Sequence, residues 1–143
     1  QKNAVFIDIG TNVGSFIYQL EQKLMHENIY AFEPNERLYF RLKRIFTNIN
    51  IYPFALSDKN ETATFKIPII KGKEFNSRGT LKVYYRENGE EKHVFQQVKV
   101  IKLDDWEDLK NLKKIDFIKI DVEGNEMQTL RGAKNMIEKF HTT

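Results

Sequence analysis

The feature that most constrains this chain is a glycine-containing segment at residues 8–14, D-I-G-T-N-V-G, between an apolar run and an amphipathic one. The segment begins at the end of residues 4–9, which are apolar apart from Asp8. Such a run is typical of a buried strand in a parallel sheet. The apolar residues after it recur at a helical spacing: Phe16, Ile17, Leu20 and Leu24. A strand, a glycine turn and a helix in this order predict the start of an α/β sheet.

The same alternation of strand and helix continues to about residue 56. Residues 29–32 form a second apolar strand, and Pro34 ends it because proline restricts the backbone of the residue before it. Asn35 is a good N-cap for the helix that follows. A third strand is predicted over residues 49–56, with Pro53 weakening its hydrogen bonding or marking a bulge.

A different rhythm occupies residues 62–103. Three strand-like stretches, 62–68, 79–85 and 93–103, follow one another without a helix between them. Polar, glycine-containing connections separate these stretches. This pattern predicts an antiparallel β insertion in the α/β core.

The chain then returns to its first pattern. A short helix is predicted over residues 104–109, a buried strand over 115–120 and a last helix over 127–140. The fold class is therefore α/β: a Rossmann-like, mostly parallel sheet flanked by helices, with an antiparallel insertion over about 62–103. A chain of 143 residues fits a single domain, and a sheet that stops after four strands predicts one truncated at its C-terminal end.

Composition excludes several classes of protein. There is no cysteine, so disulfides and thiolate metal sites are excluded and a cytoplasmic location is favoured. No apolar run is long enough for a membrane span. The net charge of +3 is spread over interleaved signs, so no nucleic-acid partner is expected. The histidines, at 26, 93 and 141, lack metal-ligand spacing, and no metal is expected.

The glycine segment does not fit a dinucleotide. The pattern G-x-G-x-x-G needs glycine where Asn12 stands, and Gly14 comes one residue too early for its last glycine. A ligand with a zwitterionic amino-acid tail fits better, with Asp8 attracting an ammonium group and loop amides receiving a carboxylate. The alternative is a tight turn without a ligand.

Glu33 gives the segment a partner. It ends the second strand, about 20 residues past the glycines, where an acid holds a ribose diol in nucleotide-binding sheets. A carboxylate can accept hydrogen bonds from both ribose hydroxyls. The two features together favour a ligand that carries an amino acid and a nucleoside.

These residues resemble class I methyltransferases that use S-adenosylmethionine, and more narrowly the FkbM family. D-I-G-T-N-V-G and A-F-E-P-N resemble the first two cofactor motifs, and P-F-A-L-S-D resembles the stretch bordering the adenine. K-L-D-D-W and I-K-I-D-V-E-G-N-E, ending in L-R-G-A, resemble the later signature. The similarity runs from Val5 to about Ala133 with five motifs in the family's order.

The resemblance implies S-adenosyl-L-methionine as the cofactor and O-methylation of a sugar or natural-product hydroxyl. Four residues would contact the methionine part: Asp8, Gly10, Asn12 and Gly14. Around the nucleoside, Glu33 would hold the ribose, and the adenine pocket would be formed by Pro34, Asn35, Ala55, Leu56 and Ser57. The partner would be a small molecule whose hydroxyl accepts the methyl group, with a carbohydrate as one candidate. The oligomeric state is left open.

Asp121 and Glu123 are the candidate catalytic residues. They follow the strand at 115–120, at the edge where open α/β sheets bind ligands, and alternate residues of an extended chain face the same way. One would orient or deprotonate the acceptor hydroxyl, and the other would orient the cofactor or bind a cation. The alternative makes both of them turn and capping acids. Lys119, in the same strand, either pairs with an acid or takes part in catalysis.

Three other functions stay open. A nucleic-acid methyltransferase would carry an Asn/Asp-Pro-Pro-aromatic pattern where this chain reads D-V-E-G. An NAD-binding oxidoreductase conflicts with the glycine segment, and a non-catalytic cofactor-binding fragment conflicts with nothing. Several insertion residues either meet substrate or belong to a solvated hairpin: Arg78, Tyr84, Tyr85, Arg86 and Lys92.

Overall fold

A four-stranded parallel sheet forms the base of the fold, in the order β3-β2-β1-β8. The computed structural model describes residues 2–74, 79–84, 86 and 88–140. The strands are β1 (Phe6–Ile9), β2 (Ile29–Phe32), β3 (Asn50–Tyr52) and β8 (Phe117–Ile120). Phe6 of β1 is in register with Ile29 of β2 and Phe117 of β8. The parallel α/β class predicted from the sequence is confirmed.

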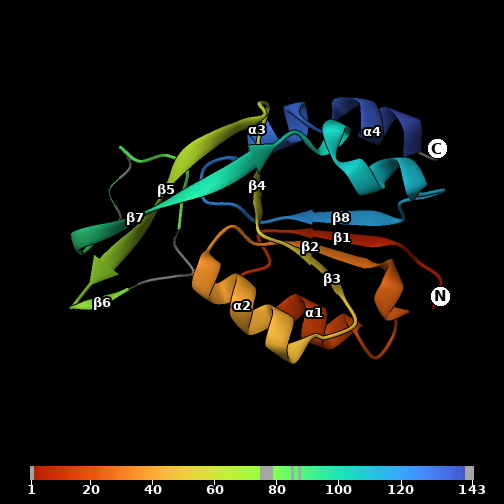
Figure 1. The fold of residues 1–143 in the computed structure, drawn as a ribbon, viewed down its shortest axis with the longest axis horizontal. Coiled ribbons are helices and arrows are strands. Elements are labelled where there is room, and N and C mark those ends of the chain that lie inside the picture. Colours follow the sequence, from red (N-terminus) through yellow and green to blue (C-terminus); the bar gives the residue numbers. More distant parts are fainter. Residues whose placement is uncertain (1, 75–78, 85, 87, 141–143) are drawn as a thin grey trace.

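Helices cover both faces of this sheet (Figure 1). One face carries α1 (Ser15–Leu20) and α2 (Glu36–Ile45), and a short 3-10 helix, η1 (His26–Asn28), precedes β2. The other carries α3 (Glu126–Arg131), α4 (Lys134–Phe140) and the 3-10 helices η3 (Leu103–Asp105) and η4 (Glu107–Asn111). Because side chains alternate along a strand, β1 supplies both faces: Phe6 packs with Ile17 and Leu42, and Ile7 with Trp106 and Met136.

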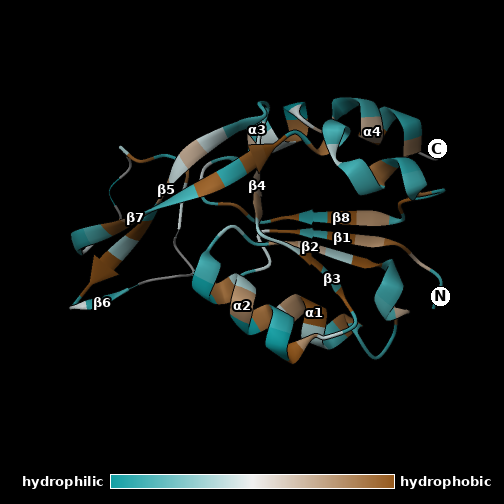
Figure 2. Cartoon of the chain, viewed as in Figure 1, coloured by the Kyte–Doolittle hydropathy of each residue, from teal (hydrophilic) through white to brown (hydrophobic). Residues whose placement is uncertain are grey.

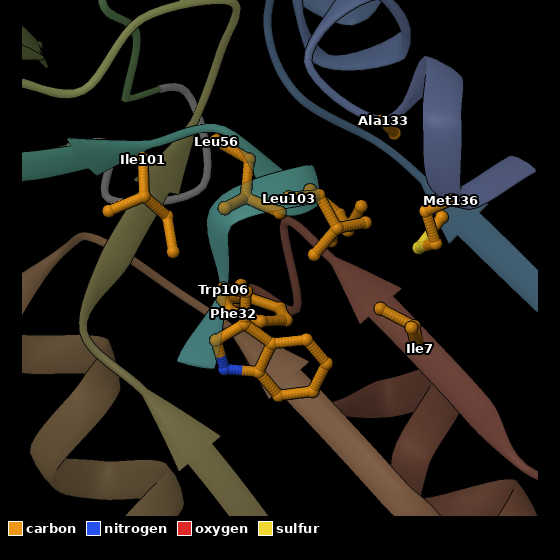
Figure 3. Packing of buried hydrophobic residues seen from close by; sticks show 9 residues of the cluster. Ile7, Phe32, Leu56, Ile101, Leu103, Trp106, Ala133 and Met136 are labelled. Atoms are coloured by element: carbon orange, nitrogen blue, oxygen red, sulfur yellow. The ribbon is translucent and has the colours of Figure 1, made fainter. Parts of the chain in front are cut away.

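The larger core lies on the α3–α4 side. Phe32 and Trp106 meet edge to face with their ring centroids 5.1 Å apart, and Leu103, Ile101 and Leu56 close over them (Figure 3). Trp106 is therefore a core residue, 4% exposed. In Figure 2, brown, hydrophobic residues occupy much of the parallel strands, whereas brown and teal residues alternate along α1 and α2.

The predicted insertion forms most of a second sheet, in the order β4-β7-β5-β6. This sheet is mixed and not purely antiparallel, because β4, from before the insertion, pairs parallel with β7. Its strands are β4 (Phe54–Leu56), β5 (Glu61–Ile70), β6 (Lys73–Glu74) and β7 (Glu90–Ile101). β5 and β7 pair antiparallel from Glu61↔Val100 to Ile70↔Glu90, which makes a long hairpin. The hairpin extends from the side of the molecule toward which the carboxyl ends of β1 and β8 point (Figure 1).

Two predicted strands are wrong. The single strand over 49–56 is split at Pro53 into β3 and β4, which belong to different sheets, because proline has no N–H for a continuous ladder. The strand over 79–85 is absent from its described part, 79–84, where an isolated bridge between Lys66 and Thr80 is the pairing present. Tyr85 lies outside the described residues.

Two predicted helices also differ. The last helix is divided into α3 and α4 at Gly132, where a Cβ atom would lie 1.9 Å from the carbonyl oxygen of Ser57. The segment over 104–109 is 3-10 rather than α-helical. None of the helices in the described part of the chain is both long and apolar enough to span a bilayer.

Candidate functional site

The turn after β1 lies in direct contact with the loop that follows the neighbouring strand, β8. Gly10 has φ = +78°, and a Cβ atom on it would lie 2.0 Å from the carbonyl oxygen of Asp121. Asp121 N–H in turn donates to the Ile9 carbonyl at 2.9 Å. Glycine is required here by both its backbone angle and the approach of the loop that follows β8.

The amides of this turn are used inside the protein. Gly10 and Thr11 both donate to the Phe32 carbonyl, at 3.0 and 3.2 Å, and Asn12 N–H donates to Glu33 Oε2 at 2.7 Å. Gly14 N–H donates to the Thr11 carbonyl at 3.0 Å. The expectation that loop amides receive a ligand carboxylate is therefore wrong for these four residues. Gly10, Thr11 and Asn12 fix the end of β2 and its acid instead, and Gly14 closes the turn on Thr11.

Glu33 is the acid so fixed. Its side chain is buried, with the residue 5% exposed, and Oε1 accepts from Asn35 N–H at 3.0 Å while Oε2 accepts from Asn12. Burial raises the pKa of Glu33 to about 7, against the opposing effect of the two backbone amides. Each carboxylate oxygen has two acceptor positions, so both oxygens retain one for a ligand hydroxyl.

Asp8 lies beside it and is completely buried. Lys119 Nζ is 3.0 Å from Asp8 Oδ1 and 3.9 Å from Asp121 Oδ2, so the lysine lies between a buried acid and an open one. Burial raises the pKa of Asp8, and the ion pair with Lys119 opposes that shift. Lys119 thus pairs with acids, as its structural interpretation proposed. Asp8 Oδ2 has no hydrogen-bond partner among the described residues.

One pocket collects most of the predicted site. Its lining includes eight of the residues proposed from the sequence: Gly10, Asn12, Glu33, Pro34, Ala55, Leu56, Asp121 and Glu123. They come from the carboxyl ends of β1, β2, β4 and β8, so four separate parts of the chain converge on one space. Asp121 is the most open of the acids, with 71% of its side chain exposed.

The other four predicted residues lie outside this lining. Asp8 is behind the pocket, paired with Lys119. A Cβ atom on Gly14 would lie 2.7 Å from Leu42 Cδ2, so this glycine allows α1 and α2 to pack. Asn35 caps α2, its side chain accepting from Arg37 N–H at 3.0 Å. The backbone of Ser57 packs against Gly132.

Sequence reasoning missed several lining residues: Phe54, Phe65, Gly79, Thr80, Leu81, Val122 and Asn125. Asn125 had a signal, because it belongs to the D-V-E-G-N-E motif. Its Nδ2 donates to the Leu56 carbonyl at 2.9 Å, and Thr129 Oγ1 donates to the same oxygen at 3.0 Å. These bonds hold the end of β4 against the start of α3.

The remaining insertion residues are elsewhere. Tyr84, Arg86 and Lys92 line a separate depression with the buried ion pair Lys66–Glu90, whose atoms are 2.8 Å apart. Arg78, Tyr85 and His141 lie outside the described residues. Over residues 2–74, 79–84, 86 and 88–140, no three histidine, aspartate or glutamate side chains are grouped as metal ligands.

Comparison with known proteins identifies the family of this chain. The family model for the methyltransferase FkbM domain matches residues 8–143. The chain therefore belongs to the FkbM family of methyltransferases, a family whose cofactor is S-adenosylmethionine.

A curated relative is the 2-O-methyltransferase NoeI of Sinorhizobium fredii, which is 28% identical over 144 residues. The alignment covers 94% of this chain and 59% of the relative, so the chain spans less than two thirds of that protein's length. No solved structure matches the chain significantly.

Proposed function

We propose that this protein transfers a methyl group from S-adenosyl-L-methionine to a hydroxyl of a sugar or of a similar natural product. The observation that carries the proposal is the buried carboxylate of Glu33, which faces the pocket with both oxygens fixed by amides of the flanking loops. FkbM membership supports the cofactor, and the relative named for 2-O-methylation supports oxygen as the acceptor atom.

The residues present fit the nucleoside and amino-acid parts of this cofactor. Glu33 would accept from the two ribose hydroxyls, and Pro34, Ala55 and Leu56 offer an apolar site next to it for the adenine. Asp8 Oδ2 is a buried acceptor with no described hydrogen-bond partner, which suits attraction of an ammonium group nearby. The turn amides serve the protein itself, so the ligand carboxylate must be received by other groups.

Asp121 and Glu123 supply what a hydroxyl acceptor needs. When bound, S-adenosylmethionine supplies an electrophilic methyl group on a sulfonium. One of the two carboxylates would take the proton of the acceptor hydroxyl, so that its oxygen can accept the methyl group that the bound cofactor would supply. Holding the acceptor hydroxyl close to the methyl group would supply much of the remaining rate acceleration.

The cofactor assignment is tested by calorimetric titration with S-adenosylhomocysteine and, separately, with NAD. We expect S-adenosylhomocysteine alone to bind and to raise the melting temperature. Glu33→Gln should weaken its binding roughly 30-fold, since charged hydrogen bonds to two hydroxyls are lost. Glu36→Gln, an exposed acid three residues away, is the matched control and should change little. Binding of NAD alone would overturn the assignment.

The acceptor assignment needs turnover. The protein is incubated with S-adenosylmethionine and a panel of methyl glycosides with free hydroxyls, and release of S-adenosylhomocysteine is followed. Asp121→Asn and Glu123→Gln are then compared, and we expect one of them to lower kcat by about 10²–10⁴-fold. Unchanged turnover in both variants would remove both carboxylates from the mechanism. Methylation of RNA in preference to every glycoside would favour the nucleic-acid alternative.

The cytoplasm is the proposed location, because a chain without cysteine suits a reducing compartment.

A further inference from the structure

Residues 79–82, which we call the insertion wall, pack against the loop that carries Asp121 and Glu123. Gly79 lies flat on the ring of Phe65, where a Cβ atom would come within 2.3 Å of the ring Cζ. At the other end of the wall, the aliphatic part of Lys82 covers Gly124, with its Cδ 3.3 Å from the position of a Cβ atom there. The wall is thus in contact with β5 on one side and with the loop after β8 on the other.

Thr80 joins these two contacts. The residue is 4% exposed, and its backbone N–H and carbonyl pair with Lys66 of β5 at 2.9 and 2.8 Å. Its hydroxyl donates to the carbonyl oxygen of Glu123 at 2.8 Å and accepts from Lys82 N–H at 3.0 Å. One hydroxyl therefore fixes the backbone at Glu123 to the insertion, although the two residues are 43 positions apart in the chain.

A second anchor ties the insertion to the opposite cofactor loop. Gln96 of β7 donates through Nε2 to the Pro34 carbonyl at 2.9 Å and accepts from Glu36 N–H at 3.2 Å. The hairpin is therefore attached beside Glu33 and beside Glu123, at two edges of the same pocket. Phe65 and Leu81 give the intervening lining an apolar surface.

We propose that the insertion wall forms the acceptor side of the pocket and that Thr80 is the positioning residue that sets the place of Glu123. This inference rests on the proposed function. An acceptor that fits presents a hydroxyl to the carboxylates and a C–H face to Phe65 and Leu81, as the ring of a pyranose does. The insertion then selects the acceptor, while the parallel sheet holds the cofactor.

The role of Thr80 is tested with Thr80→Val, which keeps the shape and removes the hydroxyl, and Thr80→Ser, which keeps the hydroxyl. Hydrogen exchange followed by mass spectrometry reports on Asp121 N–H and Asn125 N–H, the hydrogen-bonded amides of the loop. We expect Thr80→Val to speed their exchange roughly five-fold or more and Thr80→Ser to restore it. Thr64→Val is the matched control, because Thr64 Oγ1 accepts an exposed hydrogen bond from Gln97 on the same hairpin.

Cofactor binding separates this inference from the function on which it rests. Thr80→Val should leave the affinity for S-adenosylhomocysteine within about three-fold of wild type and lower kcat/KM for the best methyl glycoside roughly 10- to 100-fold. If wild type fails to bind S-adenosylhomocysteine, the proposed function fails. If it binds and the exchange of residues 121–125 is the same in all four proteins, the positioning role of Thr80 is overturned.

The side of the pocket is tested by hydrogen exchange with and without S-adenosylhomocysteine. We expect the ligand to protect residues 9–14 and 33–37 and to leave the wall amides of Leu81 and Lys82 little changed. Leu81→Trp, which fills the space beside the wall, should keep S-adenosylhomocysteine binding and lose glycoside turnover. Equal protection of the wall and the glycine turn, or loss of S-adenosylhomocysteine binding in Leu81→Trp, would assign the wall to the cofactor and overturn the proposal.

Discussion

Two pairs of carboxylates stand at the carboxyl edge of the parallel sheet, and their surroundings differ. Asp8 and Glu33 are 0% and 5% exposed, and each is held by a lysine or by backbone amides. Asp121 and Glu123 follow β8 on a loop, with 71% of the Asp121 side chain exposed. Burial raises the pKa of both members of the first pair, with Glu33 reaching about 7.

We propose that this difference reflects a division of work between a cofactor pair and an acceptor pair. A buried acid with fixed partners has one geometry, which suits a ligand that never changes, and the cofactor is such a ligand. Asp121, exposed on its loop, is accessible to an incoming molecule, and Glu123 lies half-buried on the same loop and lines the pocket.

Gly10 joins the pairs, and its replacement should have the largest effect. Gly10→Ala places a Cβ atom 2.0 Å from the Asp121 carbonyl oxygen and keeps a backbone at φ = +78°. We expect a loss of about 3 kcal/mol or more of unfolding free energy in urea, together with loss of S-adenosylhomocysteine binding. Gly72→Ala, at φ = +73° with nothing near the new Cβ, should cost about 1 kcal/mol. Equal costs for the two glycines would contradict the close contact.

Lys119→Met tests the buried pair next. It removes the ion-pair partner of Asp8 and should cost about 2–3 kcal/mol at pH 8, less than a fully buried pair because 26% of the lysine side chain is exposed. Lys119 lowers the pKa of Asp8, so the variant's Asp8 takes up a proton at higher pH than in wild type. The cost should therefore shrink as pH falls from 8 to 5.

Two further variants check that Asp8 is the cause. Lys114→Met breaks the more exposed pair with Asp116, whose atoms are 3.0 Å apart, and should cost less than about 1 kcal/mol. Asp8→Asn combined with Lys119→Met should recover part of the lost stability, because a neutral amide then replaces the buried carboxylate that lost its lysine. A cost for Lys119→Met that is independent of pH would mean that Asp8 is not responsible.

Features of the two acid pairs could be predicted from the sequence where the interacting residues are close together in the chain. The turn at Gly10, the acid at Glu33 and the N-cap at Asn35 follow from local patterns, and the structure places each as its pattern predicts. The partner of Lys119 was predicted only as a carboxylate. The register that places Lys119 beside Asp8 comes from pairing between β1 and β8, more than 100 residues apart.

The other contacts could not be predicted from the sequence, because they also join residues that are far apart in the chain. Thr80 reads as a strand residue, yet its contacts are set by Lys66 and Glu123 in other elements. Pro53 was recognised as a weak point, but which sheet each half of its segment joins depends on β7. The glycine turn was predicted to offer its amides to a ligand, whereas the carbonyl of Phe32 and the carboxylate of Glu33 take them. Local patterns give element type and position, and they do not give partners.

The pH dependence of cofactor binding sharpens the comparison from the side of Glu33. In the proposed site, the ribose hydroxyls need the ionised carboxylate. A pKa of about 7 means that Glu33 is protonated in most of the molecules below that pH. The affinity for S-adenosylhomocysteine should therefore fall about ten-fold from pH 8 to pH 6, measured by calorimetry. Glu33→Gln should bind weakly with a flat profile over the same range. A ten-fold fall that persists in this variant would assign the titration to another group.

The two acids on the loop after β8, Asp121 and Glu123, should give the smallest change in folding and cofactor binding when they are replaced. Asp121→Asn and Glu123→Gln remove charges from a loop at the mouth of the pocket, so we expect unfolding free energies within about 0.5 kcal/mol of wild type. Affinity for S-adenosylhomocysteine should stay within about three-fold, since the acids proposed to hold that ligand, Glu33 and Asp8, are untouched. If either substitution weakened cofactor binding as much as Glu33→Gln does, the two pairs would share one ligand, and the division between a cofactor pair and an acceptor pair would be wrong.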